Sequence, residues 1–140
     1  MPESDLNALL KGMNPSLSET EYYYGTFDEG TLMELAGYLD YIIGIFKEEE
    51  GLSVIFSDEA LSDLSQLTEK KVKGPFALIS LSVESDLMAV GFLAKITGAL
   101  AKEKISANAF SAYHHDHLLV PFERKDDAMK ALMKHRKPDP

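Results

Sequence analysis

The sequence predicts an α+β fold in which helices cover one face of a sheet, and three observations lead to this prediction. Segments with strand-like alternation take turns with segments whose apolar residues recur every three or four positions. In the second half, two strand-like segments flank a short polar turn, which indicates a hairpin. A charged stretch at 68–74, which ends in glycine, separates the two halves. Alternation with one hairpin is typical of the ferredoxin-like split βαβ pattern, so we expect a sandwich of two tandem units packed together.

The first half of the chain shows the alternation of strands and helices only approximately. We predict a short helix at 5–11, a turn at 14–16, a strand at 21–27, a helix at 31–49, a strand at 52–56 and a helix at 57–67. The segment YIIGIF within 31–49 is equally compatible with a strand.

The second half shows it more clearly. We predict a central strand at 76–83, a helix at 87–101 capped by Ser85 or Asp86, a hairpin that turns at 114–116, and a helix at 125–134. The 87–101 segment is so apolar that we expect it to pack against a second surface beyond its own sheet. Because this half lacks a fourth strand, the first half is expected to donate one. We therefore predict a divergent N-terminal unit at 1–72, a C-terminal unit at 73–134 and a flexible tail at 135–140.

The composition limits the class of function. The chain has 140 residues, a formal net charge of -9 and no cysteine. An acidic chain repels phosphate backbones, so we expect no nucleic-acid partner. The absence of cysteine permits a reducing compartment, and no stretch is apolar enough for a membrane span, so we expect a cytoplasmic protein without a membrane partner.

The segments 78–106 and 107–132 resemble the ACT domain family, whose small ferredoxin-like modules commonly bind amino acids and regulate enzymes or transporters. The first reads LISLSVESDLMAVGFLAKITGALAKEKIS and is similar to the strand, ligand loop and first helix of that family. The second reads ANAFSAYHHDHLLVPFERKDDAMKAL and is similar to its hairpin and second helix. The segment EEEGLSVIF resembles an uncharacterised bacterial branch with two ACT-like units in one chain. Ser111, Ala112, Tyr113 and Asp116 are similar to a hairpin pattern of the eukaryotic arginine-sensor proteins.

The loop at 83–91 is the candidate ligand site. Backbone N–H groups at a helix N-terminus favour a carboxylate, and carboxylate side chains in the loop provide a partner for an ammonium group. A helix cap and its solvated neighbours explain the same residue types equally well. The residues that we predict to bind a ligand are Ser82, Glu84, Ser85, Asp86, Leu87, Gly91, Tyr113 and Asp116.

Histidines at 114, 115 and 117 flank Asp116 and suggest a metal site. We interpret them instead as a polar hairpin turn, because neighbouring residues in an extended segment point to opposite sides. The sequence shows no phosphate-binding glycine loop, nucleophile elbow or cysteine, so we predict neither an enzyme nor a cofactor.

The leading hypothesis is a regulatory module that senses an amino acid or similar small ligand at an interface between ACT units. We expect a homodimer that acts on a regulated enzyme or transporter. The alternatives are a structural protein-interaction module without a ligand and, less favoured, a metal-dependent enzyme that uses the histidine cluster.

Overall fold

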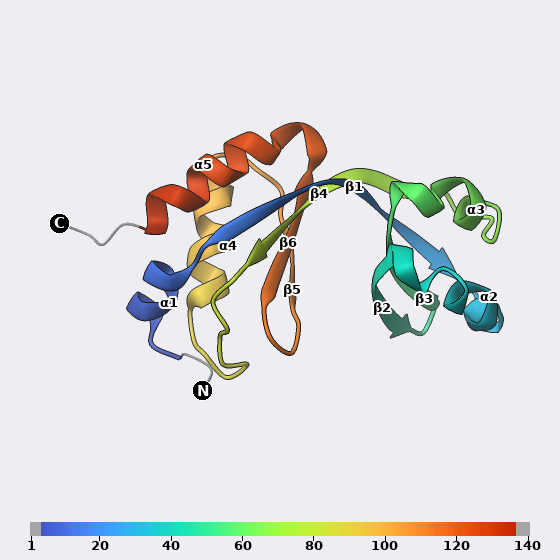
Figure 1. Ribbon diagram of the computed structural model, residues 1–140, viewed down its shortest axis with the longest axis horizontal. Coiled ribbons are helices and arrows are strands. Elements are labelled where there is room, and N and C mark those ends of the chain that lie inside the picture. Colours follow the sequence, from blue (N-terminus) through green and yellow to red (C-terminus); the bar gives the residue numbers. More distant parts are fainter. Residues whose placement is uncertain (1–3, 137–140) are drawn as a thin grey trace. The chain divides into compact units, whose positions relative to one another are not determined.

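The computed structural model describes residues 4–136, and the chain divides into two compact units (Figure 1). Unit 1 combines residues 1–19 with 77–140, and unit 2 consists of residues 20–76. Strands β1 (Pro15–Phe27) and β4 (Lys73–Leu81) each contribute residues to both units. The compact units are therefore not contiguous halves of the chain.

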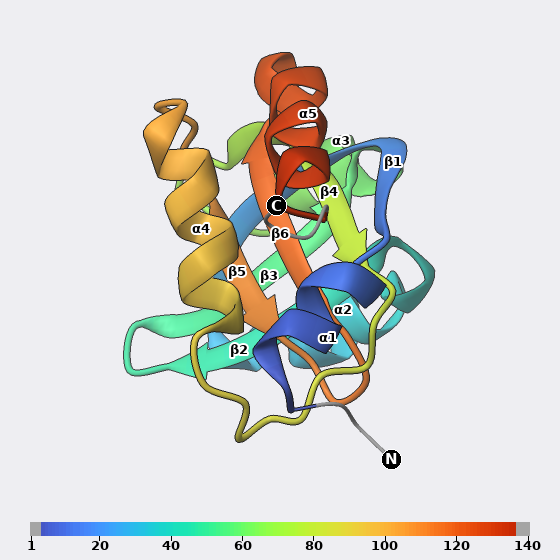
Figure 2. The ribbon, with the colours of Figure 1, turned by 90° about the vertical axis from the view of Figure 1, so that its left-hand side faces the viewer.

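Unit 1 is a sheet with the strand order β1-β4-β6-β5, covered by helices. Figure 2 shows α1, α4 and α5 in front of these strands. Its remaining elements are α1 (Leu6–Gly12), α4 (Phe92–Lys102), β5 (Asn108–Ser111), β6 (Asp116–Pro121), a 3₁₀ turn (Phe122–Arg124) and α5 (Lys125–Arg136). Because residues 15–19 belong to unit 1, the first half of the chain donates a strand to the second, as the sequence predicted.

The core of unit 1 follows from the alternation along β4. Ala77, Ile79 and Leu81 are fully buried, whereas the residues between them are half-buried. The same hydrophobic cluster includes Ile96 and Leu100 of α4. Alternate residues of β4 and residues four apart in α4 therefore contribute to one core between the sheet and the helix.

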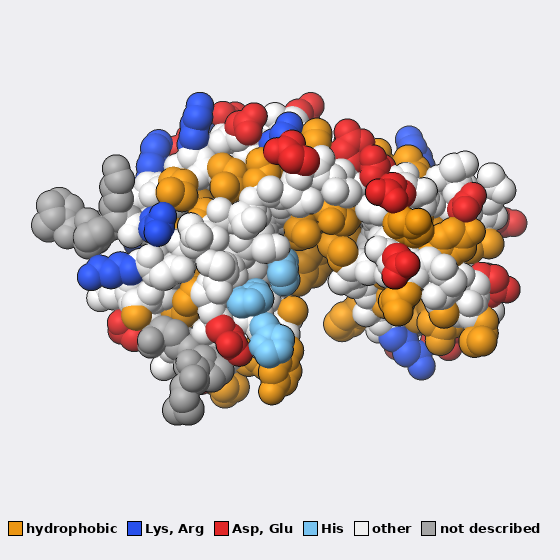
Figure 3. Space-filling model, in the orientation of Figure 1, with side chains coloured by type: hydrophobic (Ala, Val, Ile, Leu, Met, Phe, Trp, Pro, Cys, Tyr) orange, Lys and Arg blue, Asp and Glu red, His pale blue; other side chains and the backbone are white. Residues whose placement is uncertain are grey.

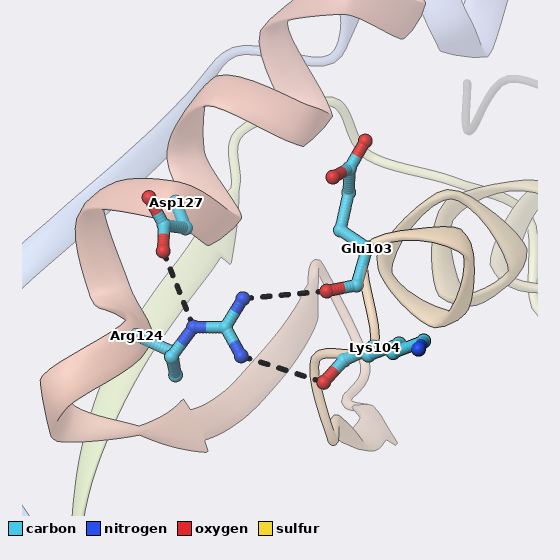
Figure 4. Close-up of polar contacts among 4 residues, drawn as sticks. All are labelled: Glu103, Lys104, Arg124 and Asp127. Atoms are coloured by element: carbon cyan, nitrogen blue, oxygen red, sulfur yellow. Dashed lines mark hydrogen bonds and ion pairs between the residues drawn. The ribbon is translucent and has the colours of Figure 1, made fainter.

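Arg124 fixes the C-terminal end of α4 to the turn before α5 (Figure 4). Its guanidinium donates hydrogen bonds to the carbonyl oxygens of Glu103 and Lys104, at 3.3 and 3.4 Å, and to Asp127 Oδ2 at 3.2 Å. Helices leave their last carbonyls without partners, and a cation is favourable there. Lys104 has a positive φ of 58°, a conformation that often follows a helix end.

Unit 2 has the strand order β2-β3-β1-β4. Strands β2 (Ile42–Glu48) and β3 (Gly51–Ser57) are antiparallel, and β3 pairs antiparallel with β1 from Tyr22↔Ser57 to Phe27↔Leu52. The short helices α2 (Leu32–Ala36) and α3 (Leu61–Ser65) follow 3₁₀ turns at Glu29–Thr31 and Asp58–Ala60, and another 3₁₀ turn spans Leu39–Tyr41. The core contains Phe27, Leu35, Leu52, Val54, Phe56, Ala60 and Leu64.

The prediction of one helix at 31–49 is wrong. Only residues 32–36 form an α-helix, and YIIGIF contributes to strand β2, which was the alternative reading. The β-branched isoleucines favour a strand, and pairing with β3 overrides the helical spacing. The turn predicted at 14–16 is also wrong for Pro15 and Ser16, which begin β1.

The helix predicted at 87–101 begins five residues later, at Phe92, because residues 82–91 form a loop. Gly91 is its N-cap and has φ 91°, so neither Ser85 nor Asp86 caps the helix. The large apolar side chains Phe92, Ile96 and Leu100 are at most 3% exposed within the single chain. Helix α4 also packs against α1 and α5, so the second surface that we expected beyond its own sheet is supplied within the chain. The large apolar side chains that stay exposed are in the loop before the helix.

None of the helices within residues 4–136 combines the length and apolar character that a membrane crossing requires. Of the tail predicted to be flexible, His135 and Arg136 belong to α5, and residues 137–140 lie outside the described part of the chain.

Candidate ligand site in unit 1

The loop from Ser82 to Gly91 turns sharply before it enters α4. The Asp86 carboxylate accepts a hydrogen bond from the Met88 N–H at 2.8 Å, and the Asp86 carbonyl accepts one from the Ala89 N–H at 2.9 Å. This is the local turn that aspartate side chains commonly stabilise. Gly91 then adopts the left-handed conformation, which glycine permits without strain.

A buried hydrogen bond connects the loop to strand β6. The Ser85 hydroxyl donates to Asp116 Oδ2 at 2.7 Å, and the two residues are 9% and 4% exposed. Hydrogen bonds to an ionised group are stronger than neutral ones. A carboxylate without a partner would be costly at such a depth. The pair therefore sets the position of the loop relative to the β5–β6 hairpin.

A cleft of about 190 Å³ lies beside this hydrogen bond. Its lining comes from the loop, the hairpin and the first turn of α4: Ser85, Asp86, Leu87, Ala89, Gly91, Phe92, Leu93, Ala94, Ser111 and Asp116.

The helical wall of the cleft is suited to an anion. The first N–H groups of an α-helix have no intrahelical acceptor, and the helix dipole places partial positive charge there. No side chain caps α4. The first residues of α4, Phe92, Leu93 and Ala94, line the cleft.

The structure brings five of the eight predicted site residues together. Ser85, Asp86, Leu87, Gly91 and Asp116 line the cleft, whereas Ser82, Glu84 and Tyr113 do not.

The other three residues lie at the surface. Ser82 is exposed, and Glu84 Oε1 lies 3.2 Å from His114 Nδ1 in a second contact between loop and hairpin. Tyr113 is 78% exposed, with its ring edge-on to that of His114 at 4.8 Å between centroids.

The sequence interpretation missed the part of the cleft formed by the first turn of α4, because it placed the start of that helix too early. It also omitted Ser111 from the site. Ser111 is paired with Asp116 in the β5–β6 register, so the predicted hairpin contained the signal that could have identified it.

The histidines of the hairpin do not form a metal site. Within residues 4–136, no three His, Asp or Glu side chains lie close enough to hold a metal ion. His117 Nδ1 lies 2.8 Å from Ser80 Oγ of the neighbouring strand β4. Burial lowers the pKa of His117 below 6.5, His115 lowers it further, and Asp116 acts in the opposite direction.

Unit 2 contains a larger cleft of about 420 Å³. It lies between the end of β1, the β2–β3 turn and the segment after α3, and its side chains include the carboxylates of Asp28, Glu50 and Glu69 and the amine of Lys70. Its lining residues are mainly polar.

Matches to protein-family models identify the family of this chain. Residues 75–134 match one model described as ACT domain, and residues 1–68 match a second one. The chain belongs to the ACT domain family. Its tandem ACT composition and α+β fold confirm the resemblance and the fold class inferred from the sequence. A search of curated proteins finds no match to this ACT chain.

Solved structures agree with the ACT assignment. A Vibrio cholerae protein of unknown function, described as a possible transport protein, is 32% identical over 94% of this chain and 96% of its own, with a TM-score of 0.80. The regulatory subunit of aspartate kinase from Thermus thermophilus is 12% identical over 91% of this chain and 100% of its own, with a TM-score of 0.69. E. coli aspartokinase III, in complex with aspartate and ADP, is 18% identical over 86% of this chain and 32% of its own, with a TM-score of 0.65.

Proposed function

We propose that this ACT chain is a non-enzymatic regulatory module that binds a small amino acid in the cleft of unit 1. The observation that carries the proposal is the juxtaposition, around one cleft, of an uncapped helix N-terminus and the buried Ser85–Asp116 pair. The helix N-terminus suits the ligand carboxylate, and the carboxylate side chains suit its ammonium group.

The two charged ends of the ligand have different partners in this proposal. The first N–H groups of α4 receive the carboxylate, because they need an acceptor and carry the positive end of the dipole. Asp86 or Asp116, both in the cleft lining, receives the ammonium group. Glu84 lies outside the lining and contributes to binding of the ammonium group through the negative charge that it adds to the loop. A cleft of about 190 Å³ favours a small amino acid.

A second copy of the chain completes the site in this proposal. Leu87, Met88 and Val90 are 63%, 83% and 85% exposed, next to the cleft. Exposed apolar side chains that lie together are typical of an interaction surface, and symmetric dimers are the commonest assembly. Ligand binding would then stabilise the dimer by mass action.

The relatives support this class of function. The E. coli structure holds aspartate, and the Thermus thermophilus chain is a regulatory subunit of an enzyme. The Vibrio cholerae relative is described as a possible transport protein. We therefore propose an amino acid as the ligand and an enzyme or transporter as the regulated partner.

An NMR titration of the full chain with each of the twenty amino acids tests the proposal. At least one amino acid is expected to shift the amide signals of residues 85–94 and 116. Asp86→Asn should weaken that binding, whereas Asp126→Asn in the exposed first turn of α5 should leave it unchanged. Titrations that shift no signals, or only signals outside the cleft, would overturn the proposal.

The same exposed loop also favours a second candidate, a structural interaction module without a ligand. In that case the oligomeric state would depend on Leu87, Met88 and Val90 and would not respond to any amino acid. Analytical ultracentrifugation of Met88→Ser, with and without amino acids, distinguishes the two candidates.

A further inference from the structure

Helix α1 packs on unit 1 from outside the stretch, residues 75–134, that matches one of the two ACT models. Leu9 and Met13 are fully buried in the core cluster of this unit. The same cluster contains Leu81 at the end of β4 and Phe92 at the start of α4. Helix α1 is therefore anchored where β4 ends and α4 begins, which is also where the loop beside the cleft starts and ends.

Helix α1 contacts both ends of that loop, residues 82–91, which we call the cleft loop. At one end, a Cβ added to Gly12 would lie 3.4 Å from Val83 Cγ2. At the other end, a Cβ added to Gly91 would lie 3.9 Å from Leu6 Cδ2. Figure 2 shows the cleft loop running around α1 from β4 to α4. These separations correspond to van der Waals contact, so α1 holds the loop at its start and at its end.

The apolar side chains of the cleft loop that are not exposed pack with those of α1. Val83 and Ala89 are half-buried against the core cluster of unit 1. Leu6 and Leu10 of α1 are half-buried against the same cluster. Helix α1 therefore provides apolar packing beside this side of the loop.

Polar contacts hold the opposite side of the cleft loop. Ser85 donates its hydrogen bond to Asp116, and Glu84 contacts His114, so this side is joined to the β5–β6 hairpin. Figure 3 shows histidine side chains gathered at the surface over this hairpin. The loop is thus held between the hairpin and α1, and a change on either side can alter the cleft.

Helix α1 is too short to be stable by itself. It has seven residues, whereas isolated helices shorter than about 12 to 15 residues are marginal in water. The Asp5 carboxylate accepts a hydrogen bond from the Ala8 N–H at 3.1 Å, which caps the helix but does not replace its packing. Docking on unit 1 therefore keeps α1 helical, and the helix has a docked state and an undocked state.

We propose that α1 positions the cleft loop, so that docking of α1 is coupled to binding of a ligand in the cleft. Leu6 and Val83 are positioning residues, because neither lines the cleft and both hold a loop that does. Undocking of α1 would free the segment that carries Asp86 and leads into the first turn of α4. Coupling between two sites is reciprocal, so a ligand in the cleft also stabilises docked α1. This inference rests on the proposed function and adds α1 as the element that the ligand controls.

A disulfide between α1 and the cleft loop tests the proposal in the full chain. The chain has no cysteine, and a Cβ at Gly12 would lie 3.7 Å from Val83 Cβ. Disulfides join Cβ atoms roughly 3.5 to 4.5 Å apart. The double variant Gly12→Cys with Val83→Cys is compared after oxidation and after reduction with dithiothreitol, so that both samples have one sequence. Oxidation is expected to slow amide hydrogen exchange at residues 85–91 about tenfold, and reduction should reverse this.

Substitutions in α1 provide a complementary test. Leu6→Ser should speed exchange at residues 85–91 about tenfold, and the conservative Leu6→Met should keep it slow. Met129→Ser, on α5, removes another half-buried side chain from the same core cluster and should leave the exchange at 85–91 unchanged. Residues 51–57 of unit 2 report whether a variant loosens the whole chain.

Adding each of the twenty amino acids tests the coupling itself. An amino acid that binds in the cleft should slow exchange at residues 8–13, which do not line the cleft, and should bind to Leu6→Ser about tenfold more weakly. The inference is overturned if such binding leaves residues 8–13 unaffected, if the disulfide does not change exchange in the loop, or if Met129→Ser acts like Leu6→Ser. If no amino acid binds, the proposed function fails, and the disulfide still decides whether α1 positions the loop.

Discussion

Ser85 and Asp116 are the residues on which the candidate site depends most directly. Each is buried, and their hydrogen bond of 2.7 Å joins the loop after β4 to strand β6. If Asp116 is removed, the Ser85 hydroxyl is left without its acceptor, and if Ser85 is removed, the carboxylate is left buried and less well paired.

A double-mutant cycle measures this connection. We expect Asp116→Ala to lower the free energy of unfolding by about 1 to 3 kcal/mol, because a buried donor loses its partner. With Ser85→Ala, the two changes should show a coupling of about 1 to 3 kcal/mol. Urea denaturation provides the measurement, and Ser82→Ala, an exposed serine of the same loop, should change stability by about 0.5 kcal/mol or less. If Asp116→Ala costs no more than Ser82→Ala, the connection has no energetic importance.

His117 makes the stability of the fold depend on pH. Its half-buried ring lies against Ser80, and burial lowers its pKa below 6.5. The unfolded chain therefore takes up a proton at a higher pH than the folded chain does. Stability contributed by neutral His117 is present above pH 6.5 and decreases as the pH falls below this value toward the lower pKa of the folded state.

We expect His117→Asn to flatten the pH dependence of thermal stability below pH 6.5, because asparagine does not titrate there. Thermal unfolding followed by circular dichroism over the acidic range measures this slope. Gln66→Asn, at an exposed position without a titratable group, serves as the control and should retain the wild-type slope. An identical slope in wild type and His117→Asn would contradict the expectation.

At the scale of single elements, α4 shows what local sequence signals can and cannot determine. The apolar spacing correctly predicted a helix through Leu100, whose core side chains pack in unit 1. Its start could not be predicted, because Ser85 and Asp86 are equally good residues for a cap and for a turn. Only the tertiary hydrogen bond to Asp116 and the left-handed Gly91 decide between the two.

Two glycines of this region provide a matched test. Gly91→Ala should destabilise the fold by about 1 to 2 kcal/mol, because alanine is strained at φ 91°, although a Cβ there would meet no atom nearer than 3.9 Å. Gly98→Ala, inside α4 with nothing within 4 Å of the added methyl group, should stabilise it by about 0.5 to 1 kcal/mol. Urea denaturation of both variants checks the opposite signs. The same sign in both would refute the assigned start of α4.

Strand β2 illustrates a different limit. The segment YIIGIF satisfies helical and strand patterns alike, and the sequence alone favoured the wrong one. The pairing with β3 decides the outcome, and such pairing is not visible within a short window.

At the scale of the whole molecule, the alternation of elements was sufficient to predict an α+β fold of the ferredoxin-like type, and the resemblance to a known family identified its two tandem units as ACT domains. The missing fourth strand of the second half correctly indicated a donated strand, which β1 supplies. The candidate site was predicted in part. Ser85 and Asp116 were identified separately, from the loop and from the hairpin pattern, but no sequence feature revealed their hydrogen bond or the cleft beside it.

A thermal-shift screen of the full chain against the twenty amino acids tests the central claim most directly, namely that the cleft beside Ser85 and Asp116 binds a small zwitterion. We predict that one amino acid, or a few chemically related amino acids, raises the melting temperature in a concentration-dependent way. At a ligand concentration one hundred times its Kd, binding should add about 2.7 kcal/mol to the free energy of unfolding. Asp86→Asn should reduce this shift. If no amino acid at millimolar concentration changes the melting temperature, the claim is contradicted.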